Sequence, residues 1–171
     1  MTDQDLKPLP PAMAELVDDF QAVTERDRLQ LLLELSKELP DLPPRYADHL
    51  DQMERVHECQ SPLFLAVEVG EAQPSDGDST HDGSSAEGPS PAAREVRLFF
   101  DAPPESPTTR GFAGILHESL DGLSPQEVLD VPDDAPYRFG LAQAVSPLRM
   151  RGMIAMLSRI KRHVRVAEGQ V

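Results

Sequence analysis

The sequence predicts an α+β domain in which a small antiparallel sheet packs against N-terminal and C-terminal helices. Apolar residues recur at three- and four-residue spacing up to residue 54 and again after residue 106, as on the buried face of amphipathic helices. Between them, Leu63 to Val69 and Val96 to Phe100 are short apolar runs with β-branched or aromatic residues, which favour buried strands. The chain has 171 residues. We therefore expect one domain over 1–171, with its core at about 12–166.

The N-terminal third predicts two helices and a shorter third segment. Thr24 is a good N-cap for the second helix, with Asp27 three residues on, as in a capping box. Pro40 ends that helix, and the third segment runs from Arg45 to Met53. The first helix has the apolar stripe Met13, Leu16, Val17, Phe20 and Val23, and the second has Leu29, Leu32, Leu33 and Leu39, widened by Leu31 and Leu35.

The C-terminal third carries clear signals for helix starts. Ser106-Pro107 and Ser146-Pro147 each place a capping residue before proline, and Ser124 to Glu127 is a capping box. Gly122 stands where a helix-ending glycine belongs. Asp133 to Leu141 is too short and polar to predict a third strand. The expected buried positions are Phe112, Ile115, Leu116 and Leu120, then Met150, Met153, Ile154, Leu157, Ile160 and Val164 in the final helix.

Residues 70–94 separate the two expected strands and differ in composition from the rest of the chain. Up to residue 93 they contain no Val, Ile, Leu, Met, Phe or Tyr, and they carry five acidic residues and no Lys or Arg. Such a segment buries too little apolar surface to offset its ordering entropy. We expect a flexible acidic insertion. It is either a hairpin extension without a function of its own or an acidic segment that attracts a basic partner.

Composition excludes several classes of protein. A net charge of −14 disfavours sequence-independent binding to nucleic acid or anionic lipid. The sequence contains no apolar run long enough to span a bilayer, and its N-terminus does not resemble a secretory signal. A single cysteine excludes an internal disulfide and multi-thiolate metal cages. We expect a soluble cytoplasmic protein that needs no metal or cofactor of its own.

Positive charge is concentrated in the final helix. Between Gln143 and Ala167 there are six Lys or Arg residues and no Asp or Glu. One interpretation is a solvated basic face that balances an acidic body. The alternative is a docking patch for an anionic group or an acidic partner.

The single thiol, Cys59, falls in a loop between a predicted helix and the first strand. Free cysteines are often buried and simply fill space. Two interpretations of Cys59 therefore remain open, a structural role and a reactive thiol. His57 and Arg55 favour the thiolate, whereas Glu58 opposes it. No histidine lies in a recognisable catalytic signature, and neither metal-ligand spacing nor a Gly-rich phosphate loop is present. Such a thiol suits chemistry in which sulfur is received and passed on.

Three blocks of the sequence resemble the SufE family, the sulfur acceptors that work with a cysteine desulfurase in iron–sulfur cluster assembly. Glu58 to Phe64 (ECQSPLF) is similar to the family's GCQS-x-[VL]-W stretch around its acceptor cysteine. Thr109 to Leu116 (TRGFAGIL) resembles a family helix start, and Val145 to Met153 (VSPLRMRGM) resembles the pattern LSP-x-R-x-[NS]-G-[LM]. The resemblance covers roughly 16–164, interrupted by the insertion.

This chain departs from the family pattern at four positions within the first and third of these blocks. Glu58 replaces the usual glycine and Phe64 the usual tryptophan. Arg151 replaces a small polar residue, and Val145 stands where leucine is usual. Loss of the glycine restricts the backbone conformations available to the cysteine loop.

The resemblance implies a fold like that of the scaffold protein of the alternative iron–sulfur system. It also implies that Cys59 accepts persulfide sulfur, stimulates a PLP-dependent desulfurase of the SufS type, and passes sulfur to an iron–sulfur scaffold complex of the SufBCD type. PLP would then belong to the partner. Arg149 is the expected cationic support, and Gln60, Ser61, Arg110 and Gly111 are expected to support loop geometry or docking.

Two alternative functions remain open. The protein could activate a desulfurase by docking alone, or it could be a hydrolase or acyltransferase with a cysteine nucleophile. As a persulfide carrier it would be sulfurtransferase-like and not a free-standing catalyst. The sequence leaves the oligomeric state open, a homodimer included.

Overall fold

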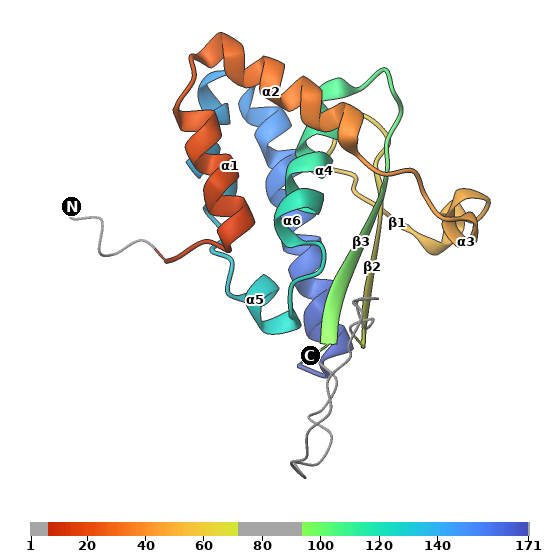
Figure 1. Cartoon of the computed structure of the whole chain (residues 1–171). Coiled ribbons are helices and arrows are strands. Elements are labelled where there is room, and N and C mark those ends of the chain that lie inside the picture. Colours follow the sequence, from red (N-terminus) through yellow and green to blue (C-terminus); the bar gives the residue numbers. More distant parts are fainter. Residues whose placement is uncertain (1–6, 72–93, 171) are drawn as a thin grey trace, which may run out of the picture.

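The computed structural model describes residues 7–71 and 94–170 and shows an α+β domain (Figure 1). Its strands form one antiparallel sheet in the order β1-β2-β3, with helices packed beside it. This confirms the predicted fold class. The elements are α1 (Pro11–Gln21), α2 (Glu25–Glu38), α3 (Pro44–Ala47), η2 (Leu50–Gln52), β1 (Glu54–Arg55), β2 (Phe64–Glu71), β3 (Arg94–Asp101), α4 (Pro107–Leu120), α5 (Pro125–Leu129), η3 (Ala135–Phe139), η4 (Leu141–Gln143) and α6 (Pro147–Ala167).

The third strand, β1, lies at the boundary where the predicted helical part ends, at residue 54. Glu54 pairs with Leu65 and Arg55 with Phe64, which makes β1 an edge strand beside β2. Two residues are too few to show the alternation that marks a strand in sequence, so only the pairing reveals it. The stretch that we considered for a third strand, 133–141, contains the 3-10 helix η3 instead.

The two long strands extend beyond their predicted ends. β2 runs to Glu71 and β3 begins at Arg94, with Gly70 opposite Glu95. The insertion predicted at 70–94 is therefore shorter at both ends, because backbone pairing continues past the last apolar residue. The rest of that predicted insertion, 72–93, lies outside the described residues.

The buried face of α2 differs from the predicted one. Leu32, Leu35 and Leu39 are buried, as expected, but Leu29 is 43% exposed. The inward position one turn before Leu32 is taken by Arg28, whose guanidinium donates to the carbonyl oxygens of Phe20 at 2.8 Å and Gly140 at 3.1 Å. The predicted face was wrong at Leu29 because it was drawn from the leucines alone, whereas the first inward residue of this helix is an arginine.

The predicted helix boundaries in the C-terminal third are confirmed, and most of the predicted core is buried. Ser124 and Glu127 form a complete capping box, and Ser146 caps α6 by accepting from the Arg149 amide at 3.3 Å. Gly122 follows α4 with a φ of 86°. Ile154 is only partly buried, whereas Met156 is fully buried.

Helices α2 and α4 cross in close contact at two glycines of α4. A Cβ on Gly111 would lie 2.5 Å from Leu32 Cγ, and one on Gly114 would lie 2.5 Å from the carbonyl oxygen of Leu35. Real Cβ atoms are not found so close to backbone oxygens. The absence of side chains at these two positions therefore sets how α4 and α2 pack.

We predict that Gly114→Ala destabilises the protein by about 1 kcal/mol. Alanine is better than glycine inside a helix by about 1 kcal/mol, but overpacking against a backbone oxygen typically costs about 1–3 kcal/mol, so the helices must separate. Urea unfolding of the purified variant measures the loss. Gly70→Ala is the matched control, since its added Cβ meets nothing within 4 Å. A Gly114→Ala variant as stable as the parent would contradict this account of the crossing.

Candidate functional site around Cys59

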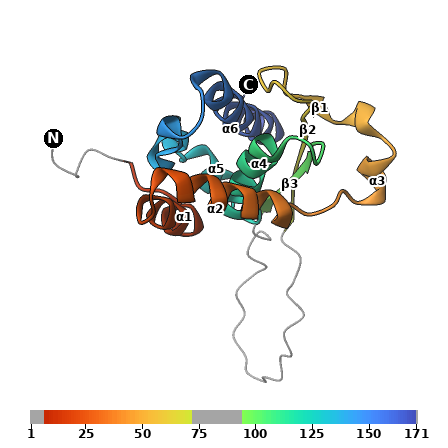
Figure 2. The ribbon, with the colours of Figure 1, turned by 90° about the horizontal axis from the view of Figure 1, so that it is seen from above.

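Cys59 lies in the loop that joins β1 to β2, which we call the Cys59 loop (56–63). The loop is closed by a hydrogen bond from the Val56 amide to the Leu63 carbonyl oxygen at 2.9 Å. Inside it, the Cys59 amide donates to the Val56 carbonyl oxygen at 3.2 Å and forms a turn. Val56 and Leu63 are both buried, so the ends of the loop are anchored in the core while its tip is not. Figure 2 shows this loop beside α6.

The Cys59 side chain rests against α6 at Gly152. A Cβ placed on Gly152 would lie 3.0 Å from Cys59 Sγ, closer than nearly all real Cβ contacts. The sulfur therefore occupies space left by the missing side chain. Cys59 is half-buried and packs against the hydrophobic core. The thiol is thus neither a fully buried space-filler nor an open surface group.

Next to the thiol, a cluster of charged groups joins β1 and the Cys59 loop to α6. Arg159 of α6 contacts both carboxylate oxygens of Glu58 with one terminal nitrogen, at 2.7 and 2.9 Å. Its other terminal nitrogen contacts Glu54 at 2.5 Å. Glu54 also pairs with Arg162 and, at 2.5 Å, with His163. These charged side chains connect one face of α6 to the base of the loop.

This cluster shifts the pKa of the Glu54 carboxyl. Partial burial works to raise it, but the hydrogen bonds and charges of Arg162, His163 and Arg159 prevail and lower the pKa to about 2. Glu54 is therefore ionised in the folded protein over the whole physiological range, and it holds Arg159 in place. The pKa of Glu58 is also lowered, first by a backbone hydrogen bond and then by Arg159.

The thiol of Cys59 is shifted in the opposite direction. Burial is the main cause and the negative charge of Glu58 adds to it, while Arg159 partly offsets them, so that the pKa rises from 9.0 to about 11. In this position the sulfur is protonated at neutral pH. The thiolate, which is the nucleophile in sulfur exchange, is therefore disfavoured while Cys59 packs against Gly152.

Three other predicted site residues lie in the Cys59 loop or in α6, the helix that the loop packs against. Gln60 is exposed and Ser61 half-buried at the tip of the Cys59 loop. Arg149 is exposed in the first turn of α6 and lies three residues before Gly152, so both are on one side of the helix.

Arg110 and Gly111 lie at the start of α4. Arg110 donates to the carbonyl oxygens of Ala102 at 2.6 Å and Ser36 at 3.3 Å, and Gly111 permits the contact with α2. These contacts tie α4 to α2 and to the end of β3. They give both residues a packing role, and the predicted support for docking stays a prediction.

Sequence reasoning did not single out three residues of the site: Gly152, Arg159 and Glu54. Gly152 was contained in the SufE-like block but carried no assigned role, because its use depends on what packs against it. Arg159 was counted among the basic residues of the final helix. Glu54 lies in β1, which the sequence did not predict.

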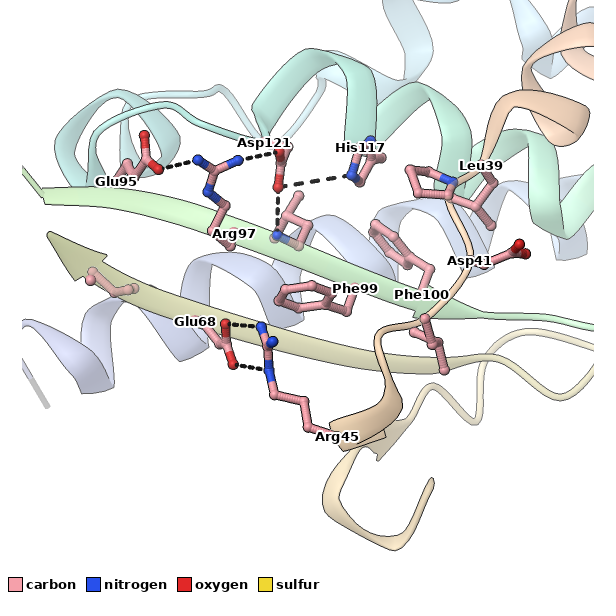
Figure 3. A pocket seen from close by; sticks show the side chains of 15 residues that line it. Leu39, Asp41, Arg45, Glu68, Glu95, Arg97, Phe99, Phe100, His117 and Asp121 are labelled. Atoms are coloured by element: carbon pink, nitrogen blue, oxygen red, sulfur yellow. Dashed lines mark hydrogen bonds and ion pairs between the residues drawn. The ribbon is translucent and has the colours of Figure 1, made fainter. Parts of the chain in front are cut away.

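A cleft of about 730 Å³ lies elsewhere (Figure 3). It opens on the face of β2 and β3 turned away from α6, under the segment between α2 and α3. Arg45 pairs with Glu68 at 2.8 Å and lies over the Phe99 ring. Arg97 pairs with Glu95 and Asp121. The two arginines of this cleft are thus paired with carboxylates. No residue of the Cys59 loop lines the cleft.

Within residues 7–71 and 94–170, no group of three or more His, Cys, Asp or Glu side chains is arranged to hold a metal ion. In the same part of the chain, no helix is long and apolar enough to cross a membrane.

Fold and site together define a small α+β protein with one thiol in a hairpin loop held against a helix. The family model described as "SufE: Fe-S metabolism associated domain" matches residues 14–88 and 90–164. The chain belongs to this family, and its association is with iron–sulfur metabolism.

Related chains agree with this assignment. An uncharacterized SufE-like protein of Mycobacterium tuberculosis is 46% identical over 94% of this chain and 96% of its own length. An uncharacterized SufE-like protein of Rhizobium meliloti is 26% identical over 94% of this chain and 97% of its own. The solution structure of a hypothetical protein from Thermus thermophilus superimposes with a TM-score of 0.71 at 34% identity, covering 95% of this chain and 99% of that one.

We predict that the Cys59 thiol ionises near pH 11 in the folded protein and near the ordinary value of 9.0 in the unfolded chain. The ultraviolet absorbance of the thiolate, with Cys59→Ser subtracted, measures both midpoints. Because the folded pKa is the higher one, the stabilisation is fully present below pH 9 and is lost as the pH rises through 11. The difference in urea midpoint between the parent and Cys59→Ser should therefore shrink over that interval. A folded-state midpoint at or below 9 would contradict the prediction.

Proposed function

We propose that this protein is a sulfur acceptor that takes persulfide sulfur from a PLP-dependent cysteine desulfurase onto Cys59, stimulates that desulfurase and delivers the sulfur to iron–sulfur cluster assembly. The partner would be of the SufS type, and the recipient a scaffold complex of the SufBCD type. The observation that carries the proposal is a single thiol in a hairpin loop whose ends are anchored in the core and whose tip is held only by exposed or half-buried groups.

The chemistry is an exchange at divalent sulfur. The Cys59 thiolate attacks the terminal sulfur of the persulfide on the desulfurase cysteine, a new S–S bond forms on Cys59, and the S–S bond of the partner breaks. The partner's cysteine leaves as a thiolate and takes the electron pair of the broken bond. The Cys59 proton is released to solvent. One S–S bond replaces another, so no external oxidant or reductant is required.

The surroundings of Cys59 favour a carrier over a hydrolase or acyltransferase. A hydrolytic cysteine needs a base in hydrogen-bond contact, itself oriented by a third group. In the described part of the chain, no side chain makes a hydrogen bond to Cys59 Sγ, and the raised pKa keeps the thiol protonated. A carrier uses such a state, because a protonated sulfur packed against Gly152 is protected until the partner draws the loop out.

The absence of a second cysteine from the sequence also supports a carrier. A neighbouring thiol would attack the persulfide and discharge it as a disulfide with loss of the carried sulfur. Arg149 would act as a cation near the emerging sulfur or contact the desulfurase. Gln60 and Ser61, which follow the cysteine at the loop tip, would support its geometry.

We predict that incubation with a desulfurase and free cysteine adds the mass of one sulfur atom to the protein, and that Cys59→Ser abolishes the adduct. Intact-mass spectrometry before and after treatment with a reductant measures the loading. Absence of the adduct in the parent protein would refute the acceptor role. If Cys59→Ser still stimulated the desulfurase fully, the protein would be an activator that acts by docking alone. Turnover of an ester or amide without any partner would favour the hydrolase.

We predict that Arg149→Ala lowers stimulation of the desulfurase by about tenfold, the loss typical of removing a cation that contacts a charged group, about 1–2 kcal/mol. The fold should be unchanged, because Arg149 is exposed. Arg165→Ala is the matched control, an exposed arginine in the last turn of the same helix. Equal stimulation by both variants would remove Arg149 from the site.

A further inference from the structure

Arg159 makes the connection between α6 and the segment that carries the thiol. Its guanidinium reaches three points of 54–58: the carboxylate of Glu54, the carbonyl oxygen of Arg55 at 3.3 Å, and the carboxylate of Glu58. The Arg159 side chain is only 17% exposed, and that of Glu58 is 46% exposed. One fixed cation thus bridges the base of the loop and its tip.

Glu58 is the tip residue that makes this contact. From His57 to Pro62, in the part of the chain described, the ion pair and hydrogen bonds of Glu58 with Arg159 are the only side-chain contacts of this kind to another residue; Glu58 also has a hydrogen bond to its own backbone. Glu58 immediately precedes Cys59, so the pair acts directly on the backbone that positions the sulfur. It also stands where the family pattern has glycine, which has no side chain to make such a contact.

The inner partner, Glu54, makes the connection one-sided. Glu54 holds Arg159 together with Arg162 and His163, and it stays ionised because its pKa is about 2. When the Glu58 side chain separates from Arg159, the guanidinium therefore keeps its ion pair with Glu54 and stays in the same position. The outer pair, with a half-exposed carboxylate, is the one that opens.

We infer that Arg159 is a positioning residue: its ion pair with Glu58 latches the Cys59 loop against α6, and the sulfur is released for transfer when that pair opens. The release of sulfur for transfer rests on the proposed function. The latch itself is a property of this protein alone and does not depend on a desulfurase. A half-exposed ion pair changes an equilibrium by up to about fivefold, enough to favour the closed loop without preventing its opening.

The test must separate the latch from the effect of charge on the thiol. Removing Glu58 also removes a negative charge that raises the Cys59 pKa, so faster alkylation alone would not identify a latch. Backbone amide exchange in 56–63 reports opening of the loop independently of the sulfur. Arg159→Lys provides a second separation, because lysine keeps the charge but cannot hold Glu54 and Glu58 with a planar fork.

We predict that Glu58→Gln increases amide hydrogen exchange in 56–63 and the rate of Cys59 alkylation by a neutral reagent, each by about fivefold. Arg159→Lys should increase both by a smaller factor. The double variant should exchange no faster than Glu58→Gln, because both changes open the same pair. Glu15→Gln, an exposed acid on α1, is the matched control and should change neither.

Two results would overturn the latch. One is faster alkylation of Glu58→Gln with unchanged amide exchange in 56–63, which would reduce Glu58 to a charge acting on the thiol. The other is an additive double variant, which would show that the two residues act independently. All of these measurements use the purified protein without a desulfurase, so the latch and the sulfur-acceptor function can fail separately.

Discussion

The contact of the Cys59 sulfur with Gly152 is the constraint on which the site depends. This contact requires a glycine in α6, which has no side chain to fill the space. It also requires that the loop between β1 and β2 has the right length and that α6 lies close to it. A separation of only 3.0 Å between the sulfur and an added Cβ leaves little tolerance for a shift of the helix. Packing of α6 against β2 and α4, and of α4 against α2 through Gly111 and Gly114, is therefore part of how the thiol is positioned.

The same contact creates a conflict between protection and reactivity. Burial and Glu58 keep Cys59 protonated, and a pKa near 11 leaves about a hundredfold less thiolate at neutral pH than an ordinary cysteine has. In the proposed sulfur transfer the thiolate is the nucleophile, so a loop that stayed closed would react slowly. The ends of the loop are fixed in the core at Val56 and Leu63, whereas its tip is held by the half-exposed pair of Glu58 with Arg159, so the tip can move while the core is kept.

The charges of the final helix divide into two groups. Arg159, Lys161 and Arg162 pair with Glu54, Glu58 or Asp133 and have structural contacts, Lys161 also bonding the Val131 carbonyl oxygen at 2.7 Å. The remaining cations of this helix, Arg149, Arg151 and Arg165, are exposed. The basic face is therefore not wholly solvated, and a docking role for its exposed arginines stays a prediction. The paired arginines face β1 and the loop, and Arg149 lies toward the N-terminal end of α6, on the side of Gly152.

The sequence by itself determined the fold class, the helix starts at Ser124 and Ser146, the two long strands and the cysteine at issue, because these depend on local signals: caps, prolines and apolar periodicity. It missed β1, since two residues carry no period, and it misassigned Leu29, since the inward position before Leu32 is held by Arg28. Only the tertiary structure gave Gly152, Arg159 and Glu54 their roles. Each of these acts through a partner roughly a hundred residues away in the chain, or through a side chain that is absent, and pairing over such a separation is decided by how α6 packs against the sheet.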